Sequence, residues 1–145
     1  METLFKDIIS KYGVKEKDVE LLPPLTLAYI GDAVYEVYVR TFLIGTMKVP
    51  VHKLHTTSIK YVKAKAQSDI IHYIDDKLTD EEKDVVRRGR NAKSGTIPKN
   101  ADITEYKYAT GFEALFGYLY LKGRFERLDE VFKLCIMKVS ESNKQ

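Results

Sequence analysis

Two carboxylates stand alone in the two most apolar segments of this chain. Asp32 is the only charged residue in segment 21–35, and Glu113 is the only one in segment 108–121. An ionised carboxylate is rarely buried without a partner, because its desolvation is costly. Neither segment holds a Lys, Arg or His, so the compensating positive charge must come from elsewhere in the fold or from a metal ion. We therefore take Asp32 and Glu113 as the candidate catalytic and metal-binding pair, since carboxylate oxygens suit Mg²⁺.

A run of positive charge lies between these two segments. It has no acidic neighbour from residue 87 to residue 100, and it consists of Arg87, Arg88, Arg90, Lys93 and Lys99. Cations at a helix C-terminus complement the helix dipole, which accounts for the arginines but not for the whole run. The loop 91–100 also contains Gly and Pro, and its backbone amides could face phosphates. We predict that this run contacts nucleic acid, and that the nearby acids catalyse metal-assisted phosphodiester hydrolysis.

Helical periodicity runs through the whole chain, and no segment alternates as a strand would, so we predict an all-α fold. A capping box, Thr79 to Glu82, marks one helix start. Asp102 marks another, and Pro23 and Pro24 mark a third. The expected helices cover approximately residues 4–13, 23–45, 52–74, 79–90, 102–121 and 125–139.

The helices that hold the two acids differ in pattern. The later one is apolar almost all round, so we expect it at the centre of the fold. Its small residues Ala109 and Gly117, one turn before and after Glu113, would let another helix approach closely. The earlier helix has one apolar stripe, and Asp32 falls on the opposite side, where an ordinary surface acid is an equally good interpretation. The predicted stripe consists of Leu27, Ile30, Val34, Val37 and Tyr38.

The composition fits one compact domain with its own core, because the chain has 145 residues and is 44% hydrophobic and 31% charged. Its single cysteine, Cys135, excludes a disulfide framework and is expected in the core. A reducing cytoplasm fits this cysteine usage. The N-terminal segment lacks the apolar stretch of a signal peptide, and no stretch is long enough for a membrane span.

Two motifs and a loop carry a resemblance to a known family. The segment LAYIGDAVYEVYVRTFL resembles the ribonuclease III signature, Glu-Arg-Leu-Glu-Phe-Leu-Gly-Asp-Ala/Ser. The segment GFEALFGYLYL resembles that family's second acidic motif, Asp-x-x-Glu-Ala-Leu-x-Gly-x-x-Tyr/Phe-Leu. Together with LAYIGDA, the loop RGRNAKSGTIPKN is similar to the mini-ribonuclease III branch. The resemblance spans essentially the whole chain, so we expect residues 1–145 to form one catalytic domain, without the double-stranded-RNA-binding domain that usually follows.

The resemblance implies a helical, homodimeric endonuclease that cleaves double-stranded RNA with Mg²⁺ and leaves 5′-phosphate and 3′-hydroxyl ends. Tyr29 matches the family's aromatic residue at the dimer contact. For the mini branch it also implies maturation of 23S ribosomal RNA in a bacterial cytoplasm. The partners would then be the 23S precursor and a ribosomal protein on a precursor particle, with no membrane involved.

The match to the family's acidic quartet is partial. Asp32 matches the aspartate after the glycine, and Glu113 matches the glutamate before Ala-Leu. Ala28 stands in place of the signature's metal-binding glutamate, Thr110 in place of the second motif's aspartate, and Leu25 in place of the earlier glutamate. Fewer protein ligands would leave more water or phosphate around the metal.

Two alternatives follow from the same residues. Because two acids of the quartet are missing, the chain could be an inactive relative that binds RNA or the ribosome. An all-α nucleotide pyrophosphohydrolase also holds Mg²⁺ with helical carboxylates. Such enzymes generally pair acids as Glu-x-x-Glu on one helix, an arrangement that Glu81 and Glu82 do not make.

Overall fold

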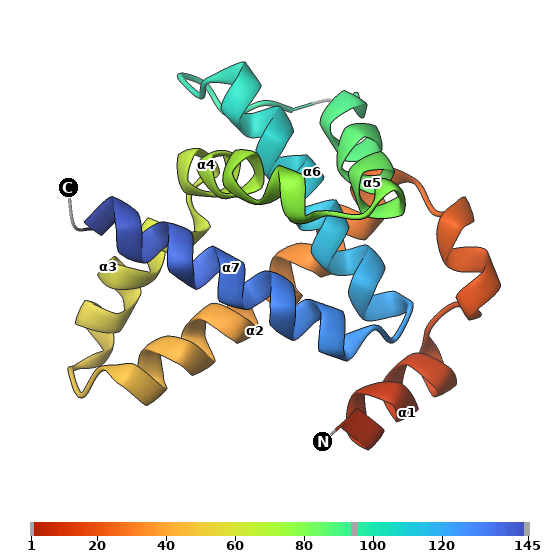
Figure 1. Ribbon diagram of the computed structural model, residues 1–145, viewed down its shortest axis with the longest axis horizontal. Helices are drawn as coiled ribbons and strands as arrows, with labels where there is room; N and C mark the ends of the chain where they lie inside the picture. Colours follow the sequence, from red (N-terminus) through yellow and green to blue (C-terminus); the bar gives the residue numbers. More distant parts are fainter. Residues whose placement is uncertain (1, 94–95, 144–145) are drawn as a thin grey trace.

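The computed structural model describes residues 2–93 and 96–143, and every regular element in them is helical, which confirms the all-α prediction. None of the helices in these residues is long and apolar enough to cross a membrane. The α-helices, shown in Figure 1, are α1 (Glu2–Tyr12), α2 (Pro24–Thr46), α3 (Val51–Val62), α4 (Ala64–Ile74), α5 (Asp80–Asn91), α6 (Ile103–Leu121) and α7 (Phe125–Asn143). Two short 3₁₀ helices, η1 (Glu16–Leu21) and η2 (Asp75–Lys77), lie in connections that the sequence pattern did not identify as helical.

Helix α6 occupies the centre of the molecule, as its apolar sequence predicts. It packs against α2, α4, α5, α7 and η1 (Figure 1). Its Phe112, Leu115, Phe116 and Leu119 side chains have no solvent exposure. A helix that is covered on all sides must be apolar on all sides. Glu113, the one charged residue in segment 108–121 of this helix, therefore requires an explanation.

Two glycines allow α2 and α6 to cross with their backbones in contact. A Cβ atom placed on Gly31 would lie 1.7 Å from the carbonyl oxygen of Glu113. One placed on Gly117 would lie 1.9 Å from the carbonyl oxygen of Leu27. Both distances are far inside atomic contact, so any side chain at either position would force the two helices apart. The close crossing fixes where the residue after Gly31, Asp32, stands relative to α6.

The core-facing side of α2 differs from the predicted stripe. Its buried positions are Leu27, Ala28, Gly31, Tyr35, Val39 and Leu43. Of the predicted stripe, only Leu27 is buried, and Val37 is exposed. The prediction was wrong because α2 is apolar on two sides, and periodicity alone does not tell which side α6 covers. The remaining stripe residues line an open apolar groove between α2 and α7.

The third predicted helix is two helices, because the chain breaks at Lys63, where φ is −63° and ψ is 153°. Side chains take up two of the carbonyl groups near the break. The hydroxyl of Tyr35 donates to the Tyr61 carbonyl at 2.9 Å, and the Nε2 of Gln67 donates to the Val62 carbonyl at 3.0 Å. Such side-chain partners satisfy carbonyls that a helix end would otherwise leave free.

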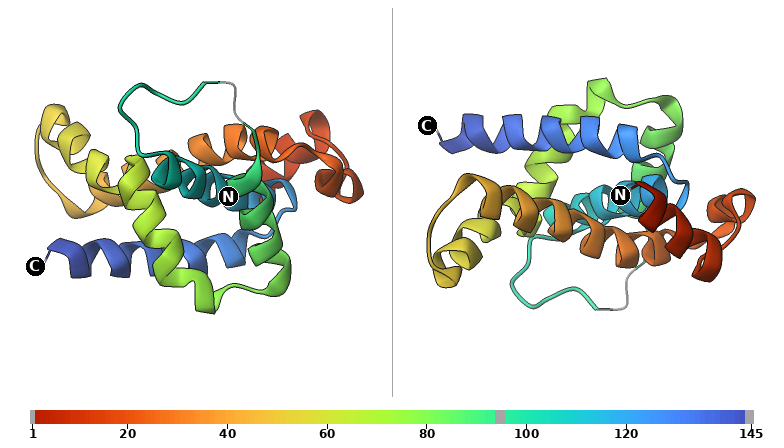
Figure 2. Two further views of the ribbon diagram at one scale, coloured as in Figure 1. Left: turned by 90° about the horizontal axis from the view of Figure 1, so that it is seen from above. Right: turned by 90° about the horizontal axis from the view of Figure 1, so that it is seen from below.

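The two predicted helix caps are confirmed. Thr79 and Glu82 form a reciprocal capping box at the start of α5, and the Asp102 side chain accepts a hydrogen bond from the Glu105 backbone at 2.9 Å. Cys135 is fully buried, also as predicted. Residues 96–102, which lead into α6, project from the side of the molecule opposite α7 (Figure 2).

Candidate active site

Asp32 and Glu113 lie on the two central helices, α2 and α6, at the point where these helices cross. The Asp32 side chain is exposed, and Glu113 is partly buried. The interpretation of Asp32 as a surface acid is therefore correct in that its side chain is exposed. The same side chain, however, also lies beside Glu113. The local fold brings the pair together because Gly31 lets the α2 backbone touch the Glu113 carbonyl.

The electrostatics of the pair are those of two acids without a cation. Burial raises the pKa of Glu113 to about 8, and the charge of Asp32, together with a hydrogen bond to it, adds to the rise. Among the described residues, neither acid forms an ion pair with a Lys, Arg or His. The described residues thus supply no compensating positive charge. Of the two sources that the sequence suggested, another part of the fold or a metal ion, the metal ion remains.

A third acid, Glu36, influences the pair from one helical turn after Asp32. Its charge also raises the pKa of Glu113. Glu36 is itself bound to Arg40, with 3.1 Å between carboxylate and guanidinium. Glu36 follows Asp32 by four residues and therefore lies on the same side of α2, but this spacing alone gives no reason to include it in the site. Because Arg40 already neutralises Glu36, we place Glu36 at the edge of the site and not among the cation ligands.

A buried amide, Gln67 on α4, is a second residue near the pair that the sequence pattern did not identify. Its side chain is only 2% exposed. A hydrogen bond from this side chain to Glu113 lowers the pKa of that carboxyl, against the effects of burial and Asp32. Its Oε1 atom is buried and has no hydrogen-bond partner. One sequence signal could have identified Gln67. Its spacing from Ile70, Ile71 and Ile74 places it on the buried, otherwise apolar side of the helix.

The other positions of the family's acidic motifs supply no ligand. Ala28 is buried, and the Thr110 hydroxyl donates to its own helix, to the Tyr106 carbonyl at 3.0 Å. In the described residues, no three or more His, Cys, Asp or Glu side chains gather as a metal-binding group. A divalent cation here would therefore have two protein carboxylates. This all-oxygen pair, which is doubly negative once Glu113 has lost its proton, fits a hard cation such as Mg²⁺.

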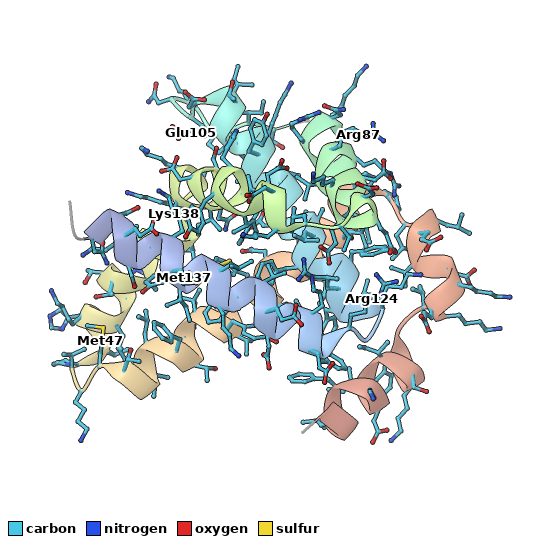
Figure 3. All side chains as sticks on the ribbon, viewed as in Figure 1. Met47, Arg87, Glu105, Arg124, Met137 and Lys138 are labelled. Atoms are coloured by element: carbon cyan, nitrogen blue, oxygen red, sulfur yellow. The ribbon has the colours of Figure 1, made fainter. Side chains whose placement is uncertain are left out.

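The predicted RNA-contacting residues lie at the end of α5 and in the loop that follows, and residues 94–95 of that loop lie outside the described residues. Arg87 points outward from α5 (Figure 3) and pairs with Asp84. Arg90, in the last turn of α5, lies over the Tyr108 ring, 5.6 Å from its centroid, so this cation is held against α6. The remaining cations are the partly exposed Arg88 and the exposed Lys93 and Lys99.

Tyr29, the predicted dimer contact, is 83% exposed on α2. Val37 and Ile44, further along the same helix, are also exposed. Between α2 and α7 lies the apolar groove, with a volume of about 670 Å³. Helix α2 thus presents apolar side chains to solvent outside the core of this subunit.

Comparison with known proteins identifies the family. A ribonuclease III domain model matches residues 25–124. A mini-ribonuclease 3 from Thermoanaerobacter is 50% identical over 93% of this chain and 92% of its own length. One from Symbiobacterium thermophilum is 56% identical over 77% of this chain and 86% of its own. A crystal structure of a Fusobacterium nucleatum protein has a TM-score of 0.74 at 31% identity, covering 83% of this chain and 96% of that one. The chain therefore belongs to the ribonuclease III family, in its mini-ribonuclease III branch, and is an endoribonuclease.

Proposed function

We propose that this endoribonuclease hydrolyses double-stranded RNA with Mg²⁺ held by Asp32 and Glu113. The observation that supports this most directly is the pair itself, a partly buried glutamate beside an aspartate, with no cation paired to either acid among the described residues. Such a site favours a divalent cation, which neutralises both carboxylates. When bound, the ion would activate water and stabilise the charge that develops on a phosphodiester.

The two acids have different surroundings and therefore different tasks in this proposal. Asp32 is exposed, so its carboxylate is open to solvent and to an RNA backbone. Glu113 lies deeper and must give up a proton before it can bind a cation, because its pKa is raised to about 8. With Ala28 and Thr110 in place of two family acids, water and RNA phosphate oxygens would complete the ion's shell. Hydrolysis that leaves a 5′-phosphate breaks the bond between phosphorus and the 3′ oxygen.

The basic run provides the RNA contact in this proposal. Arg88, Lys93 and Lys99 are at least partly exposed, and Arg90 is fixed beside α6 by its stacking on Tyr108. Duplex RNA is recognised mainly through its shape, backbone and 2′-hydroxyl groups, so cations and backbone amides are suitable contacts. Arg88 and Arg90 lie at the end of α5, and residues 96–102 project from one face of the molecule, where an extended duplex could reach them (Figure 2).

We also propose a homodimer, with the exposed apolar side of α2 at its interface. Tyr29 and Val37 are exposed, and Val37 lines the apolar groove. A two-fold pair of sites would match the two antiparallel strands of a duplex. Analytical ultracentrifugation should give twice the subunit mass at micromolar concentration, and Tyr29→Asp should give the subunit mass. A wild-type chain that sediments as a monomer with and without RNA would remove the dimer from the proposal.

The biological substrate that we propose is the 23S ribosomal RNA precursor, in the bacterial cytoplasm. A ribosomal protein on the precursor particle would be a further partner. These points extend the resemblance to the mini-ribonuclease III branch. The chemistry of the site requires only a duplex with an accessible backbone.

One digestion experiment separates the proposal from its alternatives. Duplex RNA, single-stranded RNA and nucleoside triphosphates are incubated with the chain, with and without Mg²⁺, beside Glu113→Gln as the matched inactive control. We expect cleavage of the duplex only, with Mg²⁺ only, and none by the variant. Binding of the duplex without cleavage would favour the inactive RNA-binding alternative, and release of pyrophosphate from triphosphates would favour the nucleotide hydrolase.

A further inference from the structure

The last turn of α5 touches α6 through two glycines. A Cβ atom placed on Gly89 would lie 2.8 Å from the Cα atom of Gly111, and one placed on Gly111 would lie 2.6 Å from the carbonyl oxygen of Val86. Side chains at these two positions would force the helices apart. Because Arg90 directly follows Gly89, this close contact fixes the Arg90 backbone beside α6 (Figure 1).

The ring of Tyr108, on α6, holds the Arg90 side chain. The guanidinium carbon lies 5.6 Å from the ring centroid. His72 of α4 contacts the same ring, with 4.2 Å between the two ring centroids and 49° between their planes. The His72 Nδ1 donates a hydrogen bond to the Ser68 carbonyl at 2.7 Å, which fixes the imidazole on its own helix. Three helices, α4, α5 and α6, therefore place this one cation.

Arg90 has no acidic partner in the described residues. Arg87, one turn earlier, is bound to Asp84, but none of the ion pairs among these residues includes Arg90. The hydrogen bond that its side chain makes is to a neutral neighbour, from Nε to Asn91 Oδ1 at 3.3 Å. A guanidinium carries five N–H donors, so most of those of Arg90 are left for another acceptor. A partly exposed, oriented guanidinium without an acid suits a phosphate, which can accept two parallel hydrogen bonds from it.

We propose that Arg90 is the preordered phosphate contact of the basic run, and that Tyr108 is the residue that positions it for the RNA backbone. This inference rests on the proposed function, because it assumes that the basic run contacts duplex RNA. A side chain that is already held in the free protein loses less conformational entropy when it binds. The simpler role for Arg90 is to complement the dipole of α5, and that role requires only a positive charge.

The first test measures binding of a short duplex RNA by fluorescence anisotropy, without divalent ions so that the RNA stays intact. Arg90→Ala should weaken binding about fivefold, at the upper end for an exposed ion pair. Tyr108→Leu replaces the ring by another apolar side chain and should weaken binding about two- to fivefold, the range of an exposed cation–π contact. Tyr108→Phe retains the ring and should restore wild-type binding.

Two further variants separate positioning from simple charge. Arg90→Lys keeps the positive charge but lacks the planar fork that stacks on a ring and grips a phosphate, so it should bind nearly as weakly as Arg90→Ala. In the double variant Arg90→Ala/Tyr108→Leu, loss of the ring should add nothing to the loss of the arginine, because the cation that the ring positions is already absent.

Tyr73→Leu is the matched control for the loss of a ring. Tyr73, on α4, also carries a cation, since the Nζ atom of Lys138 lies 5.6 Å from its ring centroid. Lys138 lies on α7, where that helix passes α4 (Figure 3). Removing this ring leaves the contact between Arg90 and Tyr108 intact, so duplex affinity should stay close to that of wild type.

The possible failures can be told apart. Wild-type binding by Tyr108→Leu or by Arg90→Lys, beside weakened binding by Arg90→Ala, would overturn the positioning role and leave the RNA contact of the basic run standing. Wild-type binding by Arg90→Ala would remove Arg90 as a phosphate contact. If the combined Ala variant of Arg88, Arg90 and Lys93 also bound like wild type, the proposed RNA contact itself would fall.

The wild-type chain provides a test that does not depend on any variant folding. In NMR relaxation measurements on nitrogen-labelled protein, the Arg90 Nε–H group should be as rigid as the helix backbone before RNA is added. Its signal should then shift on titration with duplex RNA. An Arg90 side chain that is mobile in the free chain, or a signal that does not respond to RNA, would contradict the inference.

Discussion

Two glutamates on helices of this protein, Glu82 buried and Glu113 partly buried, have opposite surroundings. Glu82 on α5 is 2% exposed, and both of its oxygens accept hydrogen bonds from Arg127 at 2.8 Å. Burial alone would raise the pKa of Glu82, but the bonds from Arg127 and the Thr79 backbone outweigh it, and the pKa is lowered. Glu113 on α6 has no such cation in the described residues, and burial raises its pKa to about 8.

Two other acids at this end of the fold, Glu81 and Glu20, are also paired with cations. Glu81 is bound by Arg124 at 3.1 Å and by the Tyr118 hydroxyl, and the bonds from Arg124 and Tyr118 lower its pKa. Glu20, on η1, is paired with Lys122 at 2.9 Å. This end of the fold therefore neutralises each of these acids with its own cations. The crossing of α2 and α6 does not, and this difference distinguishes acids that stabilise the fold from acids available to a cation and a substrate.

The strongest test of this difference is to neutralise each acid. Asp32→Asn and Glu113→Gln keep the size of the side chains, and they should reduce duplex-RNA cleavage to below roughly a hundredth of the wild-type rate, because an ion ligand is lost. RNA binding and the circular dichroism spectrum should change little. A variant that cleaves at nearly the wild-type rate would exclude its residue from the site.

The same substitution at the paired acid should affect stability instead. Glu82→Gln leaves Arg127 without its charged partner, and we expect the free energy of unfolding in urea to fall by about 2–3 kcal/mol. This is less than for a fully buried pair, because the Arg127 side chain is 24% exposed. Cleavage by the folded variant should stay close to that of wild type. A stable Glu82→Gln protein without activity would reverse the assignment of the two regions.

The pH dependence of the free energy of unfolding should distinguish the unpaired Glu113 from the paired Glu82. The raised pKa of Glu113, about 8 against an ordinary 4.5, means that the folded chain keeps a proton that the unfolded chain releases between these values. Without divalent ions, the Glu113 contribution to the free energy of unfolding should therefore fall as pH rises from about 4.5 to 8 and level off above 8. The free energy of unfolding of Glu113→Gln should show no such fall, and near pH 9 it should exceed that of wild type by on the order of 2 kcal/mol. Identical pH profiles would contradict the unpaired state of Glu113.

The cations at the end of α5 and in the loop that follows give the smallest expected effect. They pair with neither site acid, so we assign them to RNA phosphates. Changing Arg88, Arg90 and Lys93 to Ala should weaken duplex binding about tenfold and reduce the dependence of log affinity on log salt by up to about 0.9 per lost phosphate contact. Mn²⁺ affinity without RNA should not change. Wild-type binding across a salt titration would make the loop a simple connector.

Local signals made much of this fold predictable. The capping box at Thr79 and the Asp102 cap involve residues within one turn of each other, so sequence alone identifies them. The all-round apolar pattern of α6 likewise predicted its central place. The pair Asp32 and Glu113 was found because a lone charge in an apolar segment is conspicuous in any fold.

The features that the sequence did not reveal depend on contacts between distant segments. The break at Lys63 is accompanied by a hydrogen bond from Tyr35, 26 positions before its partner Tyr61. The buried side of α2 is decided by the glycine contacts with α6, because both sides are apolar. Gln67 stands in an apolar stripe, and only the packing of α4 on α6 connects it to Glu113.

A crystal structure of the chain in Mn²⁺, with anomalous scattering used to locate the ion, tests directly whether Asp32 and Glu113 hold the cation. We predict an anomalous peak at the crossing of α2 and α6, roughly 2.0–2.4 Å from one carboxylate oxygen of Asp32 and one of Glu113. The peak should be absent in Glu113→Gln. A fully occupied Mn²⁺ site elsewhere, with both carboxylates free, in a protein that cleaves duplex RNA with Mn²⁺, would show that the two acids do not hold the catalytic ion.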